Sequence, residues 1–192
     1  MLQELLAKSA KEKKLIGSEL LTQIMDELTA LSYDDLVTEM PEFVAKLGSV
    51  LEKRVPELEE VDTGKGTDFV LKYLPKIAEK VSSDGEVKNE LAATEDMTFN
   101  VKLGNIAEMA VQIKDGTISF SPGLGPERDF FIDMSIEKLL TILSGKDDAL
   151  SGFMGGSIEM WREGDEGDME KAQSLLPLLT VVSEKLKLER MM

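Results

Sequence analysis

The sequence predicts an α+β fold in which a five-stranded, mainly antiparallel sheet is covered on one face by helices and preceded by an N-terminal helical extension. Three features of the apolar pattern lead to this prediction. Apolar residues recur every three to four positions through residues 1–60, they alternate with polar residues from residue 97 onward, and the helical spacing returns after residue 135. We therefore divide the chain into an extension, residues 1–60, and a sheet-containing domain, residues 66–192.

The extension is predicted to hold two or three amphipathic helices. Gly17 and Ser32 interrupt the apolar repeat and mark helix boundaries, and the helical pattern ends near Pro56. Residues 56–68 are acidic, contain glycine and hold few large apolar side chains, which is typical of a linker. A further helix is expected over residues 68–81, where the helical spacing resumes.

Four strands are expected next, each with one apolar face. Their predicted ranges are Met97–Leu103, Ala107–Lys114, Thr117–Ser121 and Arg128–Met134. The Asp-Gly pair between the second and third strands is favoured in two-residue hairpin turns. We interpret the four strands as an antiparallel meander, one face of which requires a cover.

The cover is predicted from the segments that follow the fourth strand. Ser135 is a suitable N-cap for a helix that ends at Gly145, and a short helix is expected over residues 147–153. A fifth strand is expected over residues 157–162, and a long C-terminal helix over residues 168–188. The apolar stripes of these helices can cover one face of the sheet.

Composition removes several classes of function. The formal net charge is −15, so we expect no nucleic-acid partner, because nucleic-acid binding requires a positive face. The chain contains no Cys and no His, which removes disulfides, thiolate nucleophiles, imidazole ligands and His-dependent triads. No pair of acids stands in apolar surroundings that would raise a pKa, and we predict no catalytic residue, no metal site and no cofactor. The sequence holds no signal-peptide or membrane-spanning run, and a cytoplasmic location is expected.

Two loops have alternative interpretations. Residues 123–127, GLGPE, could be compared with a nucleotide-binding loop, but a strand follows where a helix N-terminus is required, so we interpret the segment as a turn. Residues 165–171 hold four acids that could gather a weak calcium ion. They lack the ligand spacing of an EF-hand, and a solvated acidic loop is the preferred interpretation.

The run MSIEKLLTILSGKDDALSGFMGGSIEMW, residues 134–161, and the order of the surrounding elements resemble the sterol carrier protein type 2 lipid-binding domain family. The resemblance spans roughly residues 66–188. Two features depart from the family pattern: Gly155 stands where Gln is common, and a longer acidic loop, residues 161–171, replaces a tight turn. The resemblance implies an apolar tunnel between the sheet and the helices that holds a sterol, a fatty acyl chain or a similar lipid, without covalent chemistry.

The tunnel implied by the resemblance would be lined by large apolar side chains from the strands and the covering helices. The candidate lining residues are Phe99, Met109, Phe120, Phe131, Leu139, Leu143, Phe153, Met154, Met160, Leu175 and Leu179. Among them, Phe153 and Met154 stand between glycines in GFMGG, residues 152–156. This segment is either a flexible gate to the lipid site or a helix-to-strand connection whose apolar residues fill the core.

We therefore expect a soluble intracellular lipid-binding or lipid-transfer protein whose partner is an apolar lipid. The negative charge repels anionic headgroups, so membrane contact is expected to be transient at most. The alternative is a non-catalytic accessory or scaffold module whose N-terminal helices bind a partner or self-associate as a homodimer. Deletion of residues 1–60 distinguishes the two functions.

Overall fold

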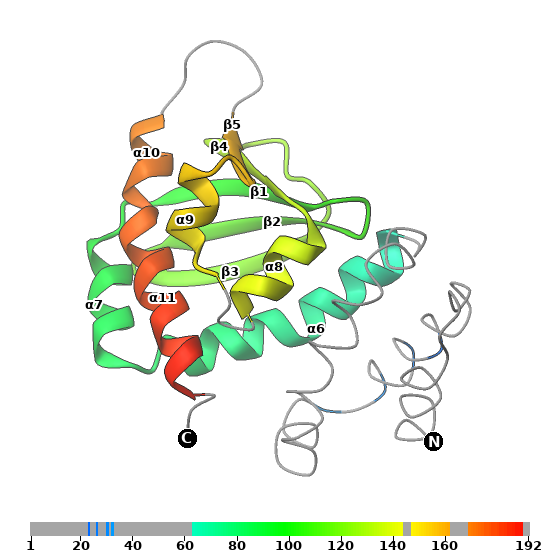
Figure 1. The fold of residues 1–192 in the computed structure, drawn as a ribbon, viewed down its shortest axis with the longest axis horizontal. Coiled ribbons are helices and arrows are strands. Elements are labelled where there is room, and N and C mark those ends of the chain that lie inside the picture. Colours follow the sequence, from blue (N-terminus) through cyan, green and yellow to red (C-terminus); the bar gives the residue numbers. More distant parts are fainter. Residues whose placement is uncertain are drawn as a thin grey trace.

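The computed structural model describes residues 63–143, 147–161 and 169–189, together with the single positions 23, 26, 30 and 32. Figure 1 labels its elements. The helices are α6 (Thr63–Val81), α7 (Gly85–Ala93), α8 (Ile136–Leu143), α9 (Ala149–Met154), α10 (Met169–Ser174) and α11 (Leu176–Glu189). The strands are β1 (Met97–Leu103), β2 (Ala107–Lys114), β3 (Thr117–Pro122), β4 (Phe130–Met134) and β5 (Ile158–Trp161).

The strands form one five-stranded sheet in the order β3-β2-β1-β4-β5. Neighbouring strands are antiparallel except β1 and β4, which run parallel. The sheet is therefore mainly antiparallel, and the predicted α+β class is confirmed. The predicted four-strand meander is wrong at its last step. After β3 the chain crosses to the far side of β1, and β4 pairs there instead of beside β3.

The crossing segment is held against the sheet by one buried side chain. The amide of Asn100, in β1, is fully buried; its Nδ2 donates to the carbonyl of Gly125 at 3.0 Å, and its Oδ1 accepts from the N–H of Gly125 at 2.9 Å. The segment between β3 and β4 therefore replaces the tight hairpin that a meander requires.

Alternation along the strands gives the sheet two different faces. We call the face that packs against the helices the inner face, and the opposite face the outer face. On the inner face Phe99 of β1 and Phe130 of β4 stack with ring centroids 5.0 Å apart and planes inclined by 5°. Helices α8, α9 and α11 lie in front of this face in Figure 1, and α6 runs along the β3 side. The hydrophobic core lies between the sheet and the helices.

Helix α6 begins earlier than predicted, at Thr63, so the end of the predicted linker is helical. Gly66 permits close contact with the turn before β2, because a Cβ at this position would lie 2.0 Å from the carbonyl oxygen of Ile106. The hydroxyl of Thr67 accepts from the N–H of Glu108 at 3.0 Å and donates to its carbonyl at 3.4 Å. These contacts attach the first turn of α6 to β2.

Helix α7 was not among the predicted elements. Its segment offers only two buried apolar side chains, Val87 and Leu91, which are four residues apart. The helix is nevertheless capped by Asp84, whose side chain accepts from the N–H groups of Glu86 and Val87. A short amphipathic repeat of this kind gives little signal, and the cap is the stronger indication of the helix.

The glycines of GFMGG have defined structural roles. At the end of α9 the N–H of Ser157 donates to the carbonyl of Gly152 at 2.9 Å, and the N–H of Gly156 donates to the carbonyl of Phe153 at 3.1 Å. With Gly156 at φ +72°, these bonds form a Schellman motif that ends the helix. Gly152 itself is buried, and a Cβ there would lie 2.5 Å from Cε of Lys138. The segment is therefore a hydrogen-bonded helix end rather than a loose connection.

The predicted C-terminal helix is divided in two. Leu175 lies between α10 and α11, and Pro177 stands in the first turn of α11. Proline has no N–H to donate to the preceding turn, so a continuous helix would lose one bond at this point. The break leaves Leu175 almost completely buried.

The predicted extension is described at only a few positions. Gln23, Asp26 and Ala30 are helical, and the carboxylate of Asp26 lies 3.5 Å from the ammonium of Lys65 in α6. Apart from Ser32, the other residues of the extension lie outside the described residues, as do Gly145 and residues 162–168 of the predicted acidic loop.

Candidate functional site

The apolar zone between the sheet and the helices is the candidate site. Eight of the candidate lining residues meet there, and we call this set the inner layer. Its members are Phe99, Met109, Met160 and Leu175, which are buried, and Phe120, Leu139, Phe153 and Leu179, which are partly buried and packed against them. They come from β1, β2, β3, β5, α8, α9, α11 and the break before α11. Elements that are distant in sequence therefore contribute to one apolar surface.

Phe131 does not belong to the inner layer. It lies on the outer face, where its ring stacks on Trp161 with centroids 4.4 Å apart and planes inclined by 9°. The guanidinium carbon of Arg128 lies 4.4 Å from the centroid of the Phe131 ring. Phe130, which precedes Phe131 in β4, faces the helices instead and is 1% exposed. The structure thus places the other phenylalanine of the pair beside the inner layer.

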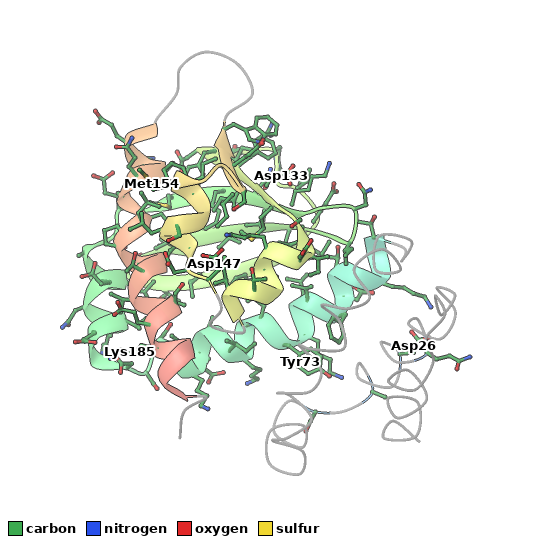
Figure 2. All side chains as sticks on the ribbon, in the orientation of Figure 1. Asp26, Tyr73, Asp133, Asp147, Met154 and Lys185 are labelled. Atoms are coloured by element: carbon green, nitrogen blue, oxygen red, sulfur yellow. The ribbon has the colours of Figure 1, made fainter. Side chains whose placement is uncertain are left out.

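Two further candidates lie elsewhere. Met154 is 78% exposed at the end of α9 (Figure 2), whereas the preceding Phe153 packs against the core. Leu143 is the last residue of α8, and its side chain lies outside the described part. Of the two large side chains in GFMGG, only Phe153 contributes to the inner layer.

One polar residue of this region was missed in the sequence. Ser183 of α11 is only 4% exposed. It stands four residues after Leu179, a spacing that places the two side chains on the same face of a helix. The helical period of the C-terminal stripe was the signal that could have identified it.

Charged groups lie at the margins of the helices. Lys185 of α11 pairs with Asp84 at 3.2 Å and with Glu86, and so joins α11 to the start of α7. The N–H of Glu86 is the main cause of a lowered pKa at Asp84, and the hydrogen bond to Glu86 is the main cause of a raised pKa at Lys185. Lys138 of α8 pairs with Asp147 just before α9. These ion pairs fix the helices relative to one another.

The buried groups determine what the site can do chemically. No Asp, Glu, Lys or Arg is buried in the described part of the chain, where the buried polar residues are Thr67, Asn100 and Ser183. The same described ranges contain no group of three or more side chains suited to a metal ion. The inner layer offers apolar contacts, which suit noncovalent binding of an apolar molecule, and the buried Ser183 stands on the same helical face as its member Leu179.

A separate pocket of about 240 Å³ lies where β1 begins and β2 ends. Its lining is mostly polar and includes Thr98, Gln112 and Asp129. Asp129 is engaged there, because its carboxylate accepts from the N–H of Thr98 at 2.8 Å and pairs with Lys171 at 2.8 Å. This pocket does not suit an apolar ligand.

The described part of the chain is thus an α+β domain in which a mixed sheet and helices enclose an apolar layer. The sequence profile of the SCP-2 sterol transfer family matches residues 74–180, more than half of the chain. This protein belongs to that family, which supports lipid binding or transfer. None of the helices in the described ranges is long and apolar enough to cross a membrane.

Several solved structures are similar in fold. A UbiJ-SCP2 ubiquinone synthesis protein is 10% identical, with a TM-score of 0.45, over 60% of this chain and 92% of that one. The sterol carrier protein domain 2 of Helicoverpa armigera is 24% identical, with a TM-score of 0.40, over 62% of this chain and 87% of its own. A sterol carrier protein 2 is 18% identical, with a TM-score of 0.41, over 59% and 90% respectively. No curated protein matches the sequence.

Proposed function

We propose that this protein binds a sterol, a fatty acyl chain or a similar apolar lipid between the sheet and the helices and transfers it without covalent chemistry. The observation that carries the proposal is the inner layer, which belongs to a domain of the SCP-2 sterol transfer family and holds no buried ionisable side chain in its described part. A catalytic role has no group to support it there.

Enclosure supplies enough free energy for such binding. Each methylene moved from water to an apolar site contributes about 0.8 kcal/mol. An acyl chain of about a dozen methylenes would therefore gain on the order of 10 kcal/mol before the costs of ordering and association. A ligand on the exposed surface would keep much of its contact with water and gain far less.

The charge favours brief contact with membranes. A net charge of −15 repels anionic headgroups, so prolonged residence on such a membrane is unfavourable. The proposal is therefore a cytoplasmic carrier that exchanges its ligand during short encounters.

Lipid extraction and an occluding substitution test the proposal. The full-length protein purified from cells should release lipid on denaturing extraction, detected by mass spectrometry. Leu179→Trp places a larger side chain in the inner layer and should weaken the affinity for lipid at least about tenfold, or about 1.4 kcal/mol, so that less lipid is retained. Leu150→Trp is the matched control, because Leu150 is 40% exposed on α9, and it should retain the wild-type amount.

Two results would contradict the proposal. One is a folded wild-type protein that neither carries lipid nor takes up added lipid. The other is equal lipid content in the two tryptophan variants, since a ligand bound outside the inner layer would be indifferent to position 179.

A further inference from the structure

The hydroxyl of Ser183 differs from the other buried polar side chains. Both polar atoms of the Asn100 amide are bonded to Gly125, and the hydroxyl of Thr67 both donates to and accepts from Glu108. Ser183 is buried to a similar degree, at 4% exposure, yet within the described ranges its hydroxyl has no hydrogen-bond partner. Buried polar groups in folded proteins are nearly always paired, so this hydroxyl requires an explanation.

Ser183 does not form the hydrogen bond that serines within helices commonly form. Ser and Thr side chains within helices commonly donate to the carbonyl four residues earlier. In the same helix Thr180 does so, with its hydroxyl 2.9 Å from the carbonyl of Leu176. The equivalent bond from Ser183 to the carbonyl of Leu179 is not formed. The hydroxyl therefore remains available to another molecule.

Ser183 is buried on a helical face of α11 that packs against the core. Leu179, one turn earlier on the same helical face, belongs to the inner layer. Lys185, two residues later, projects about 200° away around the helix and pairs with Asp84 and Glu86 at the start of α7. Ser183 therefore points away from the start of α7, and its burial places it among the helices that cover the inner face.

We propose that the Ser183 hydroxyl hydrogen-bonds an uncharged oxygen of the bound lipid, so that the protein prefers lipids with a hydroxyl or carbonyl group over plain hydrocarbons. This inference rests on the lipid binding proposed above and specifies the chemistry of the ligand. An uncharged group fits best because no Lys or Arg of the described part is buried, and Lys185, two residues along the helix, is engaged with α7. A carboxylate would be desolvated there without a countercharge.

Competition binding with a matched pair of probes tests this inference. Delipidated full-length protein is loaded with a fluorescent anilinonaphthalene sulfonate, which is displaced by dodecanol or by dodecane. The two competitors differ only by the terminal hydroxyl. We expect Ser183→Ala to weaken dodecanol binding roughly three- to tenfold and to leave dodecane binding unchanged, as loss of one buried hydrogen bond requires. Thr180→Ala, which removes a hydroxyl already bonded within α11, should alter the ratio of the two affinities by less than about twofold.

Thermal unfolding of the delipidated variants gives an independent readout. Removing an unpaired buried hydroxyl should leave the melting temperature of Ser183→Ala equal to or above that of wild type. A clear decrease would show that the hydroxyl has a partner within the protein and would overturn the inference. Equal loss of dodecanol and dodecane binding, or no loss of either, would also overturn it while leaving lipid binding intact. If wild type binds neither competitor, the proposed function fails as well.

Discussion

Asn100, on the outer face of the sheet, is fully buried, and both polar atoms of its amide are hydrogen-bonded to Gly125. Ser183, on the helix side, is nearly as deeply buried, but its hydroxyl has no hydrogen-bond partner in the described ranges. The first residue completes a contact that the fold itself requires, since it attaches the segment between β3 and β4 to the sheet. The second makes no such contact. The comparison separates a polar group that stabilises the protein from one that is available to a ligand.

The largest expected effect is on the free energy of unfolding, when either of two adjacent aromatic residues on opposite faces of the sheet is replaced. Phe130→Ala, on the inner face, should lower the free energy of unfolding by about 4 kcal/mol, because its stacked ring is enclosed by the core. Phe131→Ala, on the outer face, should cost about 2 kcal/mol, because the Trp161 ring and the Arg128 guanidinium beside it are closer to solvent and can relax into the space. Urea denaturation of both variants measures the difference. Equal losses would contradict the assignment of the two faces.

A smaller effect is expected when the outer-face amide is removed. Asn100→Ala leaves the N–H of Gly125 without its partner and its carbonyl with only the 3.4 Å bond from Arg128, and should cost about 2 kcal/mol. Limited proteolysis should then cut the segment at residues 123–127 faster than in wild type. Thr98→Ala on the same strand face is the control, because the Thr98 contacts to Asp129 are made by its backbone. If the control variant is cut equally fast, Asn100 does not hold the segment.

The smallest effect is the pH dependence of stability that comes from the partly exposed pair of Asp84 and Lys185, between the start of α7 and α11. The pKa of Asp84 is lowered in the folded protein, first by the N–H of Glu86, so its contribution to stability is present above the ordinary value of 3.8 and lost as pH falls through the lower folded value. Asp84→Asn should therefore be less stable than wild type near neutral pH, and the difference should shrink below a pH of about 3.8. Melting temperatures at low salt measure it. A difference that persists in acid would mean that the charge of Asp84 is not responsible.

Local patterns were sufficient to predict the strands, because alternation is a property of neighbouring residues. They could not indicate where β4 would pair, since its parallel contact with β1 depends on the path of residues 123–129 across the outer face. The prediction of one C-terminal helix followed the apolar stripe and did not use Pro177, which was an available signal for the break before α11. The order of elements and the family motif predicted the domain, while the strand partners are tertiary properties.

In the candidate site, too, some features follow from local patterns in the sequence and others depend on tertiary structure. In FFIDM the outward position of Asp133 places Phe131 on the outer face and Phe130 on the inner one, so alternation could have identified Phe130 as the inward-facing phenylalanine. The exposure of Met154 could not have been predicted in this way, because it depends on how the Schellman motif ends α9. Residues within regular elements were therefore easier to place than residues at their ends.

The parallel pairing of β1 with β4 also has a consequence for how the chain folds. Strands β1, β2 and β3 are joined by short turns and can assemble early from local contacts, whereas Phe99 must meet Phe130 across a long intervening segment. Contacts of this separation incur a loop-closure cost before they stabilise the fold, and they slow folding. The stacked rings of Phe99 and Phe130 on the inner face and the Asn100 amide on the outer face stabilise the sheet once β4 has paired with β1. We therefore expect the pairing of β4 with β1 to be the rate-limiting step of folding.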